Sequence, residues 1–374
     1  MNGNLRCGSV FGIPIYLNLS WFLVLALMTW TYGGGLAVQF PGLGAFLPWA
    51  LGLATAILLF ASVLAHELGH SFVALGQGIQ VRSITLFLFG GIASIEKEPS
   101  TPAGAFWVAI AGPLVSFMLC GIFIALGFLT PILSPAASII KVLAYINLAL
   151  GVFNLIPGLP LDGGNVLKAL VWKITGKPYQ GTVVASRMGQ LFGWAAIAFG
   201  TLSVLGISNF GSFWTVLIGW FLVQNAGRSG QSAKLQAQLS NLTAADAVIP
   251  KSPIVVASSS LREFANNCII GNDVKWHKFL VTDDTGKLMG EVAVSALKTI
   301  ATSEWWNIKV QALMQPIEPM LTVQSDQSLL DVVTLLEREN LSALPVIDNN
   351  QVLLGLLEKA SIRRLIVNSR PNSI

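Results

Sequence analysis

Acidic residues are scarce over most of this chain. Residues 1–240 contain four acids, Glu67, Glu96, Glu98 and Asp162, beside ten Lys and Arg. A hydrophobic fraction of 53% and a mean hydropathy of +0.68 exclude an ordinary soluble protein. Residues 241–374 instead carry twelve basic and fourteen acidic residues. The composition therefore divides the chain into a membrane part of net charge +6 and a normally charged part of net −2.

Cysteine is also rare, and its spacing excludes two kinds of site. Cys7, Cys120 and Cys268 form no CxxC pair, so neither a disulfide framework nor a thiolate zinc site is indicated. A signal peptide is not expected either. One basic residue precedes Leu17, and no small-residue cleavage site follows the first apolar run. That run is expected to be a permanent membrane span.

Long apolar runs predict about six transmembrane helices. We place them near residues 18–36, 47–75, 103–129, 137–156, 188–206 and 208–224. The loops 37–46, 130–136 and 207–211 carry no charge, whereas the basic residues, Lys141 excepted, fall on the other side. The positive-inside rule then places both termini in the cytoplasm of a multi-pass cell-membrane protein. The pI near 9.0 reflects this asymmetry rather than nucleic-acid binding.

Three further segments are not typical of membrane spans. Residues 4–16 predict a short strand near the membrane surface, and residues 80–98 a β-hairpin that turns near Gly90-Gly91. Residues 228–242 are expected to form a polar linker or a short helix that leads to an internal repeat with a period near 65. Each repeat, 243–303 and 307–370, is expected to run strand, helix, strand, turn, strand, helix. The fold class is thus a polytopic α-helical membrane domain, residues 1–227, followed by a tandem α/β pair.

The second apolar run contains His66-Glu67-Leu68-Gly69-His70. Histidines four residues apart share one helix face and can bind one metal ion, and Glu67 is placed to reach a water held by that metal. Ionisable groups inside a span cost about 2.5 kcal/mol or more each, which disfavours a chance occurrence. The alternative is a structural polar cluster at a helix end.

A catalytic zinc ion usually has three protein ligands. The chain's third histidine, His277, lies in the charged repeat, where a surface role is favoured. Asp162 follows a helix-breaking run of Pro and Gly after the fourth span, and it could instead cap the next helix. Because the histidines lie on the same side and no rival acid lies within the spans, we favour Asp162 as the third ligand.

These features resemble the site-2 protease family of intramembrane zinc metalloproteases, peptidase family M50. The matching motifs cover about residues 1–225: His66–His70, Phe89-Gly90-Gly91, Ala111-Gly112-Pro113, and Asn154 with Pro157, Pro160 and Asp162-Gly-Gly164. Pro113 could mark either a kink or a tight helix contact. The resemblance implies one zinc ion per subunit, bound by His66, His70 and Asp162, with Glu67 as general base and Asn154 at the oxyanion. It also implies cleavage of membrane-spanning protein substrates. We further expect the 84–95 hairpin to accept an unwound substrate as an added strand, with Leu86 and Leu88 at its edge.

The doubled C-terminal repeat resembles a CBS pair, as in the bacterial and cyanobacterial branch of that family. CBS pairs often bind adenine nucleotides through an Asp after the last strand of each repeat. Ala296 and Ser361 occupy those positions here, so nucleotide binding is doubtful and a regulatory or dimerising role is favoured.

The competing function is a membrane metal transporter or a zinc-binding scaffold without protease activity. A transporter should line a path through several spans with polar residues, but here they gather at one depth.

Overall fold

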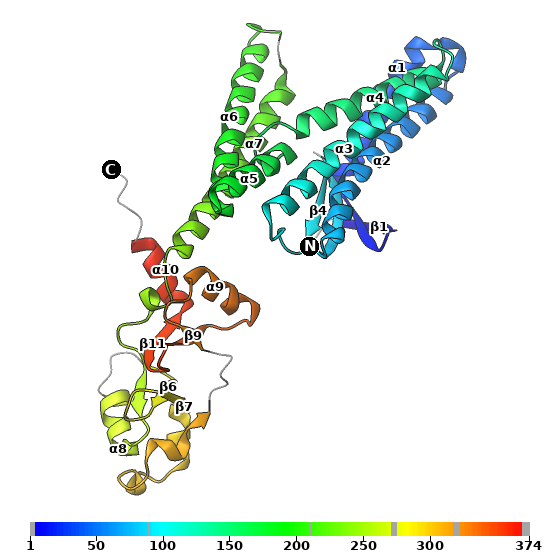
Figure 1. The fold of residues 1–374 in the computed structure, drawn as a ribbon. Coiled ribbons are helices and arrows are strands. Elements are labelled where there is room, and N and C mark those ends of the chain that lie inside the picture. The colour runs from blue at the N-terminus through cyan, green and yellow to red at the C-terminus, as the bar shows by residue number, and fades with distance from the viewer. Residues whose placement is uncertain (1–3, 89, 210, 271–274, 317–321, 369–374) are drawn as a thin grey trace. The chain divides into compact units, whose positions relative to one another are not determined.

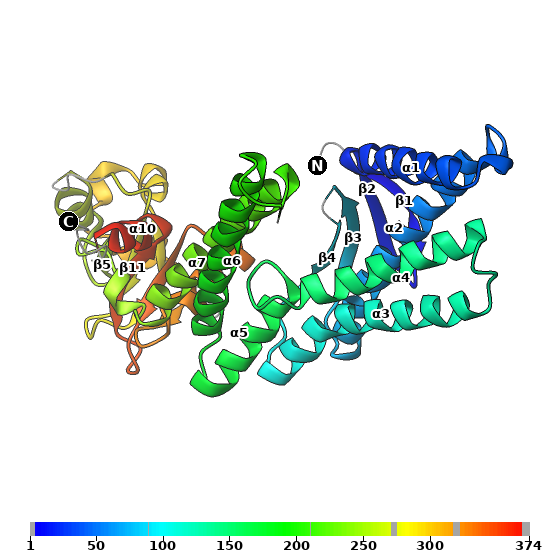
Figure 2. The ribbon, with the colours of Figure 1, turned by 90° about the horizontal axis from the view of Figure 1, so that it is seen from above.

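A computed structural model describes residues 4–88, 90–209, 211–270, 275–316 and 322–368. The chain forms two compact units, residues 1–234 and 235–374. Unit 1 contains four helices that are long and apolar enough to cross a membrane: α1 (Leu19–Gln39), α2 (Leu47–Gly76), α3 (Pro102–Phe128) and α4 (Pro135–Asn154). Figures 1 and 2 show these helices running side by side. The protein is therefore a membrane protein.

The four helices begin at recognisable sequence signals. The side chains of Asn18, Thr101 and Ser134 each accept a hydrogen bond from a backbone N–H in the first turn of the helix that follows. Pro occupies the first turn of α2, α3 and α4, where its missing N–H costs nothing. These polar caps satisfy donors that lipid cannot satisfy.

Three more helices follow: α5 (Asp162–Thr175), α6 (Pro178–Val204) and α7 (Phe213–Ser240). The predicted fifth and sixth spans fall on α6 and α7, which are not among the four candidate spans. Only the second half of α6 and the first half of α7 are apolar. The two helices pack closely through glycine, because Gly193 meets Gly219 and Val223, and Gly200 meets Val216. Six spans therefore stay a prediction.

A four-stranded sheet lies against α2 with the order β1-β2-β3-β4 (Figure 2). Its strands are β1 (Asn4–Val10), β2 (Ile13–Asn18), β3 (Val81–Phe87) and β4 (Gly90–Ile95). Residues 4–18 thus form two strands rather than one, and β2 pairs in parallel with β3. The expectation that Leu86 is an edge residue was wrong, because it pairs with both Leu17 of β2 and Gly91 of β4. Within this hairpin β4 is the edge strand, and β1 forms the opposite edge of the sheet. Phe89 lies outside the described residues.

Unit 2 contains the two repeats, and each repeat builds the same motif. In the first, β5 (Ile254–Val256) pairs in parallel with β6 (Lys278–Thr282), which pairs antiparallel with β7 (Leu288–Ala293). In the second, β9 (Val323–Gln324), β10 (Ala343–Ile347) and β11 (Leu353–Glu358) repeat that pattern. The connecting helices are α8 (Leu261–Glu263), extended by a π-helix over Phe264–Ile270, and α9 (Leu329–Arg338); α10 (Lys359–Asn368) follows β11. A short strand β8 (Gln315–Pro316) joins β7.

The repeat extends to the turn that joins the second and third strand of each motif. Asp283 Oδ1 accepts hydrogen bonds from the N–H groups of Thr285 and Lys287, and Asp348 Oδ1 accepts from those of Asn350 and Val352. The Thr285 hydroxyl and the Lys287 N–H hold the pKa of the exposed Asp283 carboxyl below its usual value. Two copies of one motif therefore share one way of closing a turn.

Candidate metal centre

Helix α2 presents two buried histidines on one face. His66 and His70 lie four residues apart, so their imidazoles occupy adjacent turns of the helix. Their residues are 3% and 8% exposed, which is unusual for a polar side chain unless it is bonded. The intervening Glu67 also lines the cavity described below.

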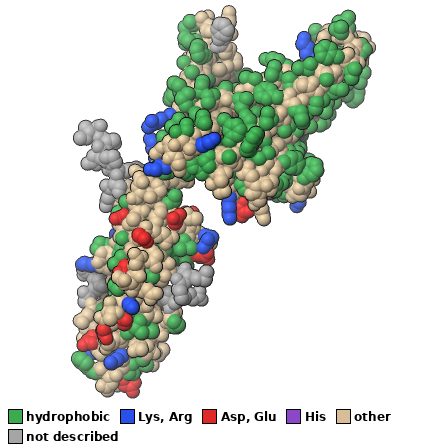
Figure 3. Space-filling view, viewed as in Figure 1, with side chains coloured by type: hydrophobic (Ala, Val, Ile, Leu, Met, Phe, Trp, Pro, Cys, Tyr) green, Lys and Arg blue, Asp and Glu red, His purple; other side chains and the backbone are tan. Residues whose placement is uncertain are grey.

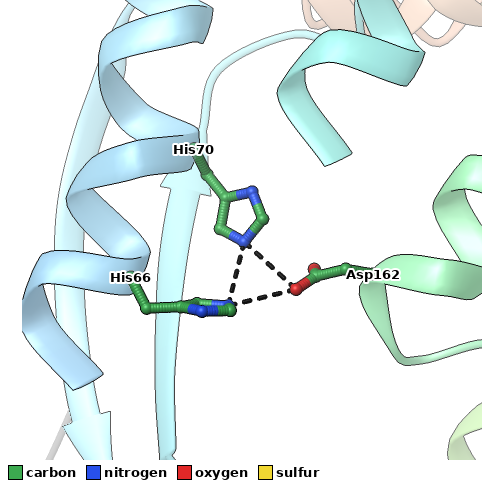
Figure 4. A group of neighbouring side chains, drawn as sticks. All are labelled: His66, His70 and Asp162. Carbon is green, nitrogen blue, oxygen red and sulfur yellow. Dashed lines mark hydrogen bonds and ion pairs between the residues drawn. The ribbon is translucent and has the colours of Figure 1, made fainter. Parts of the chain in front are cut away.

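Asp162 lies far from the two histidines in the sequence but close to them in space. It is the first residue of α5 and follows the loop after α4. The loop is held by α6, because the Leu159 N–H donates to Ala185 O and Gly158 lies against Gly189. The Asp162 side chain does not cap α5. Its carboxylate points instead toward the histidines (Figure 4).

The three side chains meet at ligand distances. Asp162 Oδ2 lies 3.1 Å from His66 Nε2 and 3.3 Å from His70 Nε2, and the two Nε2 atoms are 3.3 Å apart. In a tetrahedral zinc site with bonds of about 2.0–2.1 Å, neighbouring ligand atoms lie about 3.3–3.4 Å apart. The observed triangle therefore has the size that a zinc ion requires. Within the described part of the chain, no other group of three His, Cys, Asp or Glu side chains is placed to hold a metal ion.

Hydrogen bonding on the far side of each ring fixes how the imidazoles face the centre. His70 Nδ1 lies 2.6 Å from Val108 O, and His66 Nδ1 lies 2.9 Å from Ser116 Oγ. Because a carbonyl oxygen only accepts, His70 Nδ1 carries a proton, and in the neutral ring, the form that binds a metal, its Nε2 presents a lone pair. A lone pair and a carboxylate oxygen this close repel each other unless a proton or a metal ion lies between them. The donor set thus fits a metal ion.

Helix α3 is packed tightly against the site. A Cβ atom at Gly112 would collide with the Nε2 atoms of both histidines, and one at Gly69 would lie 3.0 Å from Ala111 O. Helix α3 continues through Pro113. Of the two interpretations of Ala111-Gly112-Pro113, the structure supports the tight helix contact.

A cavity of about 400 Å³ opens in front of the three side chains. Glu67 lies in its wall and accepts a hydrogen bond from the Ala93 N–H of β4. A Cβ atom at Gly91 would lie 2.9 Å from Glu67 Oε1, so the strand approaches this carboxylate closely. Asn154, the last residue of α4, lines the same cavity. His277 belongs to unit 2 and is not part of this site.

The sequence did not predict several neighbours of the site. Ser116 and the Val108 carbonyl, which orient the imidazoles, lie one turn to either side of Gly112 on α3. Their only sequence signal was the unexplained Ala111-Gly112-Pro113 motif. Lys168 and Glu98, which also line the cavity, had no signal beyond their charge.

Comparison with known proteins gives the family. The family model "Peptidase family M50" matches residues 54–136 and 132–196, and the CBS domain model matches residues 310–368. The Synechocystis protein named "Putative zinc metalloprotease sll0528" is 54% identical over 99% of this chain and 97% of its own. The Mycobacterium tuberculosis protein named "Putative zinc metalloprotease Rip3" is 29% identical over 98% of this chain and 93% of its own. The structure of "Site-2 Protease from Methanocaldococcus jannaschii" is 32% identical, with a TM-score of 0.44, over 61% of this chain and 95% of that one. The chain belongs to peptidase family M50, the site-2 protease family of metalloproteases, and carries a C-terminal CBS domain.

Proposed function

We propose that this zinc metalloprotease cleaves membrane-spanning segments of protein substrates, using His66, His70 and Asp162 as its zinc ligands. The observation that supports this most strongly is the triangle of ligand atoms, 3.1–3.3 Å on a side, that faces a cavity among apolar helices. When bound, zinc polarises the scissile carbonyl and lowers the pKa of a water molecule.

Glu67 is the general base. Its carboxylate shares the cavity with the ligands and is held by the Ala93 N–H. It takes a proton from the attacking water and later gives that proton to the leaving amine. The Asn154 amide donates to the oxygen that becomes negative during attack, a contact typically worth about 3 kcal/mol.

The free edge of β4 binds the substrate as an added strand. The Glu96 N–H donates to Gln80 O next to β3. Backbone groups alternate in direction along a strand, so the even-numbered residues of β4 direct theirs toward β3, whereas Gly91, Ala93 and Ile95 direct theirs outward. All three line the cavity. The Ala93 N–H already donates to Glu67, so an unwound substrate segment pairs with the remaining outward groups, chiefly those of Gly91 and Ile95, and so places its peptide bond beside Glu67.

A cleavage assay tests the protease function. The full chain is combined with a single-span substrate tagged at both ends, and zinc content is measured in parallel. We expect Glu67→Ala to abolish cleavage while zinc stays bound, and Asp162→Ala to abolish both. Glu96→Ala, which removes a carboxylate outside the cavity, should behave as wild type. Cleavage that survives Glu67→Ala rejects this mechanism, and full zinc retention by Asp162→Ala removes that residue as a ligand.

The strand-addition step has its own test. Ile95→Pro removes one outward N–H without breaking a bond to β3, whereas Ile95→Ala keeps that N–H. We expect the proline variant to lose most cleavage with its zinc intact, and the alanine variant to keep it. Equal cleavage by the two variants would refute strand addition.

The chain organisation and topology belong to the same proposal. We place six spans in residues 1–227, a linker at 228–242 that is mostly the C-terminal part of α7, and the CBS repeats at 243–303 and 307–370, with both termini in the cytoplasm. The CBS pair serves regulation or dimerisation rather than nucleotide binding. In support, the Ser361 hydroxyl, at a position where nucleotide-binding repeats have Asp, donates to Ala247 O and Glu358 O. Light scattering of the full chain, with and without AMP, tests both points.

A further inference from the structure

Three charged side chains that line the cavity, Lys97, Glu98 and Lys168, have no part in the chemistry above. Lys168 lies on α5, and its side chain is 13% exposed. Its Nζ donates to Glu98 Oε2 at 2.7 Å. Glu98 lies between β4 and α3, and its side chain is 76% exposed. An almost buried ammonium group is therefore neutralised by a carboxylate that is itself in contact with water.

Lys168 shares a helix face with Asp162. Asp162, Asn165, Lys168 and Trp172 follow each other at intervals of three or four residues, and all four line the cavity. Lys168 lies six positions after Asp162, about 9 Å along the helix axis. An extended substrate advances about 3.3 Å per residue. The Lys168 ammonium group thus lies about two to four residues from a peptide bond positioned beside Asp162.

A substrate that fills the cavity contacts both Lys168 and Glu98, because both side chains line it, and a substrate carboxylate there competes with Glu98 for the ammonium group. A largely covered ammonium group that loses its partner is destabilised, so an entering segment that supplies a replacement carboxylate is favoured over one that does not. Lys97 lines the same cavity, so a basic substrate residue would meet like charge there.

We propose that Lys168 is a specificity-determining residue that binds an acidic side chain of the substrate two to four residues from the cleaved bond. Glu98 is the counter-ion that this side chain displaces. The inference rests on the proposed protease function and names its substrate class: membrane-spanning segments with Asp or Glu close to the cleavage site.

The test compares substrates that differ in one residue. Asp, Asn or Lys is placed at each position two to four residues from the mapped cleavage site, on either side. Both ends continue into tags, so no chain-end carboxylate enters the cavity. At the sensitive position, wild type should cleave the Asp substrate about tenfold faster than the Lys substrate. Lys168→Glu should reverse this preference, and Lys168→Glu combined with Glu98→Lys should keep the reversal while restoring the overall rate.

A matched control removes an ion pair outside the cavity. Arg82 pairs with Glu96 at 3.4 Å, and its side chain is 68% exposed. Arg82→Glu should keep the wild-type preference for Asp, and zinc content reports whether each variant is folded. If Lys168→Glu slows all substrates equally, the pair merely ties two elements together and the inference fails. The inference also fails if zinc-loaded wild type cleaves the Asp and Lys substrates equally. If zinc-loaded wild type cleaves none of the substrates, the protease function is overturned as well.

Discussion

The two units of this chain place polar and apolar side chains in opposite ways. Of the buried polar side chains that the structure describes, all but Thr282 belong to unit 1. Of the largest fully buried apolar side chains described, all but Ile84 and Leu143 belong to unit 2. Unit 1 instead exposes large apolar side chains along α1–α4, as the hydrophobic surface in Figure 3 shows.

This contrast follows from the two solvents. In water, burial of apolar surface drives folding, so unit 2 encloses Leu, Val and Ile. In lipid, apolar side chains gain little by association, so helices pack through small residues and buried hydrogen bonds. Asn147, which donates to Ser62 Oγ and Leu143 O, is an example. The same packing rule leaves room in unit 1 for a buried polar site.

The largest expected effect concerns a small residue of unit 1. Gly112→Ala places a methyl group against both imidazoles, so we expect at least about a 100-fold loss of zinc affinity and no measurable cleavage. Metal analysis after dialysis measures the loss. Gly121, on the same helix with open space around it, supplies the control Gly121→Ala. Normal zinc content in Gly112→Ala would show that the helix contact is not essential to the site.

The next effect concerns a large residue of unit 2. Leu336 of α9 is fully buried, and Leu336→Ala should lower the free energy of unfolding of unit 2 by about 2–5 kcal/mol. Denaturant titration followed by hydrogen exchange in α9 measures this, with Leu354→Ala at an exposed position as control. Zinc content should not change. Loss of zinc would show that the two units do not fold independently.

A pair of substitutions compares the two surfaces directly. Ile122 of α3 and Leu354 of β11 are both 45% exposed. Ile122→Asp should cost about 2.5–3.5 kcal/mol of membrane insertion, whereas Leu354→Asp should change stability by less than about 0.5 kcal/mol. An insertion assay and thermal unfolding measure the two values. Similar tolerance at both positions would contradict a lipid-facing α3.

The smallest effect concerns pH and unit 2. Because the pKa of Asp283 is lowered by folding, its charged form stabilises unit 2 above the ordinary Asp pKa of about 3.9, and this contribution is lost as pH falls through the lower, folded value. Asp283→Asn should reduce hydrogen-exchange protection of β6 and β7 at pH 7 and make progressively less difference below about pH 4. Asp326→Asn is a matched control on an exposed acid. A difference that does not depend on pH would rule out the ionised turn.

The sequence by itself determined the elements whose signals are local. Apolar runs located α1–α4, the His-Glu spacing located one half of the site, and the similarity of two segments located the repeats. It also favoured Asp162 as the third ligand, because residues 1–240 contain so few acids. Each of these features depends on residue type and spacing along one stretch of chain.

Only the tertiary structure decided what depends on contacts between distant segments. It showed that β4, and not the strand that carries Leu86, is the edge strand of the hairpin, because residues 13–18 pair with β3 from the other side. It brought Asp162 within 3.3 Å of both imidazoles across 96 and 92 positions of sequence. It also set Ser116, Val108 and Gly112 behind those rings and Lys168 against Glu98. Such contacts depend on how helices and strands pack, and no local pattern in the sequence encodes them.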